Sequence, residues 1–194
     1  MNSIPLFPLN TVLFPEGLLP LRIFETRYID MIRECLRGEG GGFVVLSIRE
    51  GIETSAEARF STLGTRAEVI DWEQRPDGLL GILACGRERV RVVSHERRPD
   101  GLLVGRVEAV EEWPALELPL EFSSLAGLLE RLLDQLGAPW SHLERRVGDS
   151  AWVAGRLTEL LPLDLGIKQQ LLEEDDPLER LRRLRSAMLV AQNP

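Results

Sequence analysis

The chain opens with IPLFPL at residues 4–9, VLFPEGLLPL at residues 12–21 and IFETRY at residues 23–28. The first two segments are apolar, strand-like runs that prolines interrupt. The third leads into residues 26–37, whose apolar side chains recur at spacings of three and four, on one face of a helix. We therefore predict two strands followed by an amphipathic helix, which Gly38 is placed to end.

Strands are expected to dominate the chain up to about residue 115. Short apolar runs rich in β-branched residues predict strands at residues 43–48, 79–85, 89–93 and 103–110. The string RPDGLL occurs twice, at residues 75–80 and 98–103. Because proline presets the first turn position and Asp-Gly tolerates the remainder, we favour two hairpin turns over a functional duplication.

From about residue 118 the apolar residues follow the period of a helix. Leucines recur between residues 125 and 136, with Ser123 or Ser124 as a possible cap and Gly137 after the last turn. Further helices are expected from Asp149 or Ser150 to Pro162, from Leu165 to Glu174, and from Pro177 onward.

The last of these helices carries the clearest start signal. Asp176 is its expected cap, and Glu179 stands where a capping box would use its carboxylate. The chain is therefore divided into a β-rich part, residues 1–117, and a helical part, residues 118–194.

Composition narrows the possible functions. The chain has 194 residues, 44% of them apolar, and a formal net charge of -8. An acidic surface repels phosphate backbones, so nucleic acid is not expected as a partner. Without a signal peptide or a long apolar run, we expect a cytoplasmic protein that does not contact membranes.

Metal and disulfide chemistry is not expected either. Cys35 and Cys85 do not form a C-x-x-C pair and stand among apolar residues, which favours buried free thiols. With His95 and His142 as the only histidines, a four-ligand zinc site is not expected. We predict no metal and no cofactor.

The opening motifs resemble the amino-terminal, substrate-binding domain of the Lon ATP-dependent protease family. Later segments match the same family in the expected order: LGTRA at 63–67, GRERVRV at 86–92, KQQLLE at 168–173 and ERL at 179–181. The resemblance implies an α+β fold, in which a PUA-like β pseudo-barrel with an inserted helix precedes a small helical bundle. It also implies a stand-alone substrate-recognition module.

Two positions depart from the family pattern. Glu16 stands where many members have glycine, and Thr26 replaces the usual proline. Thr26 is still a competent helix cap, so we expect the helix start to be retained.

The sequence gives no sign of catalysis, and we predict that the chain is not an enzyme. It contains no G-x-x-x-x-G-K-[ST] motif, so the phosphate-binding loop of an ATPase is missing. Lon proteolysis uses a serine-lysine dyad, and the only lysine here, Lys168, has no serine nearby in sequence. We interpret Lys168 as a solvated surface residue.

Three groups of residues are candidates for protein binding. The first is the proline-stiffened loop with Phe14, Pro15 and Leu18, although these side chains can equally fill the core. The second is Glu25, Arg27 and Tyr28, for which we favour an ion pair that ties the helix to the barrel. The third is Trp72 and Trp113, because tryptophan is enriched at interfaces as well as in cores.

The resulting hypothesis is a non-catalytic module that engages unfolded or apolar segments of other proteins. The alternative is a partner-specific adaptor or scaffold that docks on one folded protein. RNA binding by the barrel through Arg87, Arg89 and Arg91, which alternate along a predicted strand, is less favoured.

Overall fold

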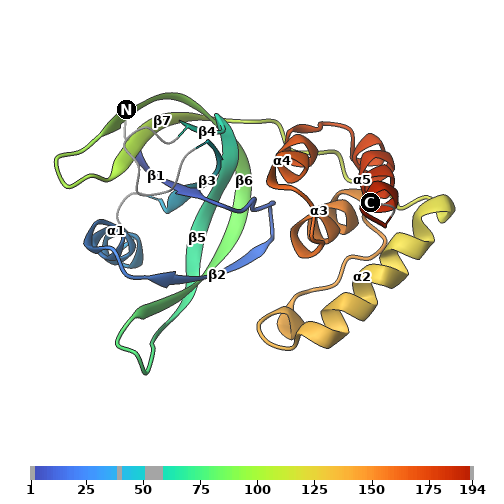
Figure 1. Cartoon of the computed structure of the whole chain (residues 1–194), viewed down its shortest axis with the longest axis horizontal. Helices are drawn as coiled ribbons and strands as arrows, with labels where there is room; N and C mark the ends of the chain where they lie inside the picture. The colour runs from blue at the N-terminus through green and yellow to red at the C-terminus, as the bar shows by residue number, and fades with distance from the viewer. Residues whose placement is uncertain (1–2, 39–40, 51–58, 193–194) are drawn as a thin grey trace. The chain divides into compact units, whose positions relative to one another are not determined.

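A computed structural model describes residues 3–38, 41–50 and 59–192 of the chain (Figure 1). The chain divides into two compact units, residues 1–111 and residues 112–194. Within these described ranges, the first unit holds the strands and one helix, and the second holds the other helices. Each unit is described by itself.

The first unit is a ring of strands interrupted by one helix, which confirms the α+β pseudo-barrel. Its elements are β1 (Ile4–Leu9), β2 (Leu18–Ile23), α1 (Thr26–Leu36), β3 (Phe43–Glu50), β4 (Arg59–Phe60), β5 (Leu63–Gln74), β6 (Leu80–Arg97) and β7 (Leu103–Ala109). Neighbouring strands follow the order β1-β7-β6-β5-β3, and β3 pairs with β1 in parallel, which closes the ring. The other pairings are antiparallel.

The longest strand, β6, pairs with three other strands. The two strands expected at residues 79–85 and 89–93 are parts of this single strand of 18 residues. It pairs with β2, β5 and β7. The sequence pattern divided this strand because Gly86 and the charged residues after it interrupt the apolar run, and the pairing with β5 shifts register at the same place, between Gly86 and Arg89.

The two RPDGLL strings form two hairpin turns of the same kind, as predicted. In each turn a glycine with positive φ, Gly78 at 79° or Gly101 at 85°, lies at the tip. In each turn the aspartate before that glycine accepts a hydrogen bond from a backbone N–H two residues on, Asp77 from Leu79 and Asp100 from Leu102. Repetition of the string therefore reflects repeated turn chemistry.

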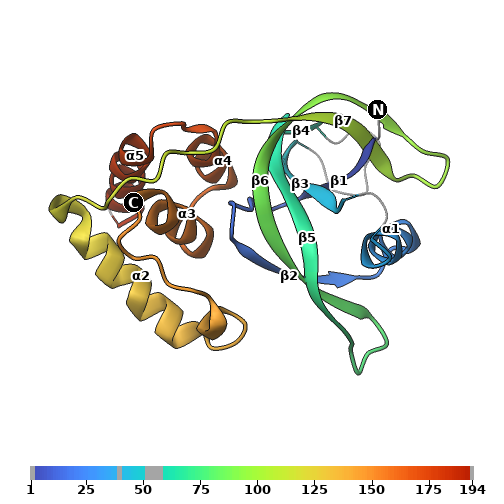
Figure 2. The same ribbon diagram turned by 180° about the vertical axis from the view of Figure 1, so that it is seen from behind.

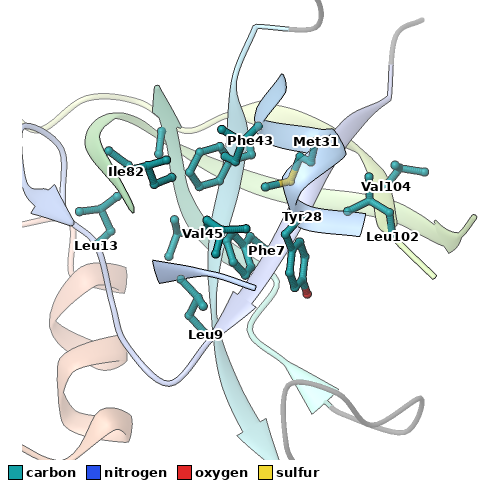
Figure 3. Close-up of a cluster of buried hydrophobic side chains, with 14 residues drawn as sticks. Phe7, Leu9, Leu13, Tyr28, Met31, Phe43, Val45, Ile82, Leu102 and Val104 are labelled. Carbon is teal, nitrogen blue, oxygen red and sulfur yellow. The ribbon is translucent and has the colours of Figure 1, made fainter. Parts of the chain in front are cut away.

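Helix α1 packs onto the main apolar core of the first unit (Figure 3). Its buried side chains are Tyr28, Met31 and Ile32, at the predicted helical spacing. They meet Phe7 of β1 and Phe43 of β3, and the Phe7 and Tyr28 rings stack with centroids 4.0 Å apart. The helix is therefore an integral part of the barrel core.

The capping role expected for Thr26 is wrong. Thr26 is the first residue of α1, and Glu25 takes the cap position without a side-chain hydrogen bond to the helix. The carboxylate of Glu25 pairs instead with Arg27, with 2.8 Å between Oε2 and Nη2. The carboxylate at the cap position is therefore used in an ion pair and does not cap the helix.

The second unit consists of α2 (Ser123–Leu136), α3 (Ser150–Leu160), α4 (Leu165–Glu173) and α5 (Pro177–Gln192), with short 3-10 turns at Leu120–Phe122 and Trp140–His142 (Figure 2). These helices confirm the predicted ones. Helix α3 packs against the other three and buries every residue from 152 to 158. It is therefore the centre of the bundle.

The predicted cap of α3 is confirmed, whereas that of α2 is wrong. Asp149 caps α3, since its Oδ1 accepts from the N–H groups of Ala151 at 2.8 Å and Trp152 at 3.1 Å. The serine cap of α2 is wrong, because Phe122 holds that position without a side-chain bond.

The capping box of α5 is also wrong. Asp176 accepts from Leu178 N at 2.8 Å as expected, but its own N–H donates to Glu174. Glu179 bonds to Arg182 and Arg183, which lie one turn further along the helix. These arginines attract the carboxylate that the capping box would have used.

The strip from residue 112 to 117 belongs to the helical unit. Trp113 lies against the guanidinium of Arg180, 3.5 Å from its ring centroid. Ser150 donates to the carbonyls of Leu116 and Glu117. These contacts place the division between the units at residue 111, six residues before the sequence-based boundary at 117.

Candidate functional site

A three-stranded extension of the barrel, here called the arm, carries two of the predicted site residues, Leu18 and Trp72. The arm consists of β2, residues 69–74 of β5 and residues 80–85 of β6, with β6 in the centre. Its inner face contributes Ile82 and Ala84 to the main core. Because side chains alternate along a strand, Leu83 and Cys85 point to the outer face.

The outer face of the arm is apolar over its central part. In the strand register, Leu18 lies opposite Cys85 and Pro20 lies opposite Leu83, so these side chains share one face. Ile70 is the extra residue of a bulge between Val69 and Asp71 on the neighbouring strand, with 48% of its surface exposed, and Asp71 lies opposite Leu83. We call Leu18, Pro20, Ile70 and Leu83 the outer arm face.

Trp72 lies on the same arm but not on its outer face. It pairs with Ile82 in the register, so it stands on the inner side, beyond the edge of the core, and is 57% exposed. An indole this exposed on a strand is available for contact with another molecule.

The loop before β2 contributes less surface than its composition suggested. The side chain of Phe14 is completely buried, whereas Pro15 and Leu18 are half-buried. The backbone forms a turn in which Gly17 N donates to Phe14 O at 3.0 Å. The fold therefore uses Phe14 to anchor the loop and leaves the later residues at the surface.

Glu16, which stands where many members of the resembled family have glycine, is expected to lower the stability of the fold. Glu16 has φ of 64°, at the turn position after Pro15 where glycine is favoured. We expect Glu16→Gly to raise the free energy of unfolding by about 0.5–1 kcal/mol, because relief of the left-handed conformation exceeds the entropy that glycine adds to the unfolded chain. Urea denaturation measures the change. Glu16→Ala is the control, since a gain equal to that of glycine would trace the effect to the lost charge.

Glu25, Arg27 and Tyr28 form a structural link. Arg27 pairs with Glu25, donates from Nη1 to the Gly101 carbonyl at 2.9 Å and lies 4.6 Å from the centre of the Tyr28 ring. These contacts tie the start of α1 to the turn between β6 and β7, which is the interpretation favoured from sequence. Beside them Phe24, with 67% of its surface exposed, borders a shallow hollow that Glu25 and Arg27 also line.

Trp72 and Trp113 fall in different units. Trp113 is half-buried in the helical unit, where it stacks on Arg180. Its neighbour in that contact is a buried cation, which indicates a role in packing the helices.

The alternating arginines of β6 do not form an exposed basic row. Arg89 is 3% exposed and donates to the carbonyl of Glu111 at 2.9 Å. Arg87 is neutralised by Glu68, at 2.8 Å. Across the same strands, hydrogen bonds from Arg66 hold the pKa of the Glu88 carboxyl below its usual range. Arg91 is exposed, but with Arg89 buried and Arg87 paired with an acid the three arginines do not present a continuous row to a phosphate backbone.

Lys168 is half-buried in α4, so its interpretation as a solvated surface residue is wrong. Its Nζ donates to the carbonyl of Glu159 at 2.9 Å, near the end of α3, where a cation is favourable. Burial lowers the pKa of this amine. The residue therefore stabilises the bundle, a role that its sequence neighbours do not reveal.

The remaining reactive groups do not assemble into a site. Burial raises the pKa of the Cys35 thiol to about 11, which disfavours the reactive thiolate. Across residues 3–38, 41–50 and 59–192, no three His, Cys, Asp or Glu side chains are grouped to hold a metal ion. No helix in that part of the chain is long and apolar enough to span a membrane.

Comparisons with known proteins identify relatives along nearly the whole chain. Residues 3–189 match the profile of the ATP-dependent protease La (LON) substrate-binding domain. The Lon protease of Anaeromyxobacter dehalogenans is 26% identical over 186 residues, which are 92% of this chain but 22% of that protein. The chain thus spans under a quarter of the length of this relative.

Two solved structures have the same fold. The Lon N-terminal domain protein from Xanthomonas campestris superposes with a TM-score of 0.76 and 38% identity, covering 96% of this chain and 98% of that one. The N-terminal domain of Mycobacterium avium complex Lon protease gives a TM-score of 0.64 at 23% identity, over 94% of this chain and 96% of that one. The second likeness concerns the fold alone.

Proposed function

Because this chain belongs to the LON substrate-binding domain family, we propose that it is a non-catalytic module that binds exposed apolar segments of other polypeptides. The ATPase and protease activities of full-length Lon relatives lie outside the proposal, since the chain matches 22% of such a protein. Binding by this module needs neither cofactor nor metal.

The outer arm face is the observation that carries the proposal. In the strand register Leu18, Pro20 and Leu83 share one face, and the exposed Ile70 stands at the bulge of the adjacent edge strand. Clustered apolar surface on a rigid sheet marks a site for protein contact, because its burial releases water without ordering a flexible loop. Leu18, predicted from sequence, belongs to this face, whereas Ile70 and Leu83 were not predicted.

In the proposed module, the other predicted residues stabilise the fold or extend the apolar surface. Pro15 and Phe14 hold the turn that leads into β2, and Trp72 extends the apolar surface beyond the edge of the arm. Glu25, Arg27 and Tyr28 fix α1 against the barrel. Trp113 serves the packing of the helical unit.

Fluorescence anisotropy of a labelled, permanently unfolded protein, reduced and carboxymethylated, tests this function when titrated with the whole chain without ATP. We expect saturable binding. Ile70→Asp should weaken this binding about tenfold, because complex formation would then desolvate a carboxylate where the wild type buries an apolar side chain. Val93→Asp is the matched control: Val93 is also a β-branched strand residue, 44% exposed against 48% for Ile70.

Two outcomes would contradict the proposal. Equal weakening by the two variants would remove the outer arm face from the site. Absence of saturable binding would reject the module itself and favour the adaptor hypothesis, in which one folded protein is the partner and co-purifies in stoichiometric amount.

A further inference from the structure

We propose that the free edge of β5 in the arm accepts part of the bound polypeptide as an additional strand, and that it prefers extended segments in which apolar and basic residues alternate. The proposal rests on the proposed function and deepens it, because it names the backbone conformation and the side-chain pattern of the ligand.

The outer edge of β5 is open along the arm. The pairing of β5 with β3 ends at Ala67, opposite Phe43. Among the described residues, β6 is the one strand that pairs with β5 from Glu68 to Gln74. It occupies the other edge of β5. A strand edge of this length offers a row of N–H and C=O groups to an incoming chain.

One backbone contact shows which groups face outward. The N–H of Trp72 donates to the carboxylate of its neighbour Asp71 at 2.8 Å, instead of to β6. It therefore points to the free edge, and by alternation along the strand the N–H of Gln74 points the same way. Asp71 covers one of these donors with a side chain that an incoming carbonyl can displace.

The opposite edge of the arm is less suitable. Strand β2 carries Pro20 in its middle, and proline cannot donate to an added strand. Arg22 of β2 is also held by an ion pair with Asp77 at the hairpin tip. No proline occurs in β5. The two edges of the arm thus differ in their capacity to pair, and β5 is the competent one.

The side chains along the β5 edge alternate in chemistry as well as in direction. Asp71 and Glu73 lie opposite Leu83 and Gly81, on the outer side of the arm, whereas Trp72 lies opposite Ile82 on the inner side. Asp71 and Glu73 are exposed, and Glu73 has a long 3.4 Å contact with Arg75. An added strand would place basic side chains beside the two carboxylates and apolar ones beside Trp72.

The same charges disfavour a second copy of this chain as the occupant. Antiparallel pairing of two β5 edges would bring the carboxylates of Asp71 and Glu73 close to those of the partner copy. Like charges across a strand pair are destabilising, and each chain carries a formal charge of -8. A segment of another protein with alternating basic and apolar residues would pair with the backbone of this edge and also neutralise its carboxylates.

Backbone N-methylation of the ligand separates strand addition from simple apolar burial. The probe is a fluorescein-labelled nonapeptide of alternating valine and lysine, titrated with the whole chain and followed by anisotropy. Two variants of this peptide carry N-methyl groups on alternate residues, one set on the valines and the other on the lysines. Because successive N–H groups of a strand point to opposite edges, only one set faces β5.

We expect one methylated peptide to bind at least about tenfold more weakly, because it loses several backbone hydrogen bonds, and the other to stay within about threefold of the parent. Equal loss, or no loss, in both peptides would overturn strand addition while leaving the binding of unfolded protein intact. Failure of the unfolded protein to bind is a separate result, which would overturn the proposed function.

Charge selectivity is tested with the double variant Asp71→Asn, Glu73→Gln, which removes both charges and keeps the size of each side chain and one accepting oxygen on it. We expect it to weaken the valine-lysine peptide about tenfold and to strengthen a valine-glutamate peptide. Unchanged preference would overturn the selection of basic residues. A wild-type dimer in sedimentation, lost on Trp72→Pro, would show that a second copy occupies the edge and would overturn the proposal.

Discussion

Replacing Gly86 with alanine is expected to lower the free energy of unfolding of the first unit by about 3 kcal/mol, at the upper end of the cost of overpacking. A Cβ atom at this position would lie 2.2 Å from the carbonyl oxygen of Phe14 and 3.2 Å from Cγ of Leu13. The backbone cannot move aside, since Gly86 O accepts from Glu16 N at 2.8 Å and Gly86 N donates to Gly17 O at 2.9 Å.

Urea denaturation followed by far-UV circular dichroism measures this loss. Gly166→Ala is the control, because an added Cβ there meets no atom within 4 Å and lies in α4. The control should be neutral or stabilise the chain by up to about 1 kcal/mol. A Gly86→Ala midpoint equal to that of the wild type would mean that the turn at residues 14–17 does not lie against β6 in solution.

Replacing Arg180 with leucine is expected to lower the free energy of unfolding of the helical unit by about 3–5 kcal/mol. Arg180 has no exposed surface, and its guanidinium donates from Nε to Leu171 O at 2.7 Å and from Nη2 to Glu174 O. The same group stacks on Trp113. Leucine would leave two carbonyls without this donor and would remove the cation from the indole face.

The matched control is Arg182→Leu, two residues along the same helix. Arg182 is exposed, and its contact with Glu179 is 3.4 Å long, so its loss should change stability by less than about 0.5 kcal/mol. Thermal and urea unfolding by tryptophan fluorescence compares the two variants. Changes within about 1 kcal/mol of each other would contradict the role assigned to the buried guanidinium.

Gly86 and Arg180 show what a sequence motif can identify and what it cannot explain. Gly86 and Arg180 both stand in motifs that match the family, GRERVRV and ERL, so the sequence marks them. It does not explain them. The reason for Gly86 is a backbone carbonyl some seventy residues earlier, and the reason for Arg180 includes an indole outside its own helix.

Candidate site residues were predicted less completely than the fold. Phe14 and Leu18 are both apolar residues of the proline-rich segment predicted as a loop, yet the first is fully buried and the second begins β2, on the outer arm face. Leu83 stands in an apolar run and Ile70 in a mixed one, and neither pattern indicates a surface site. Their exposure depends on which strand lies on each side of β6, which is a long-range property.

By itself the sequence determined the change from a strand-rich part to a helical part, the two hairpin turns, the amphipathic character of α1, and the family. These features depend on local periods and on turn residues, which act over a few positions. Only the tertiary structure decided the closure of the ring, the left-handed strain at Glu16, the burial of Lys168 and Arg180, and the open edge of β5. Each of these depends on atoms that are distant in sequence and adjacent in space, and a local pattern does not record that adjacency.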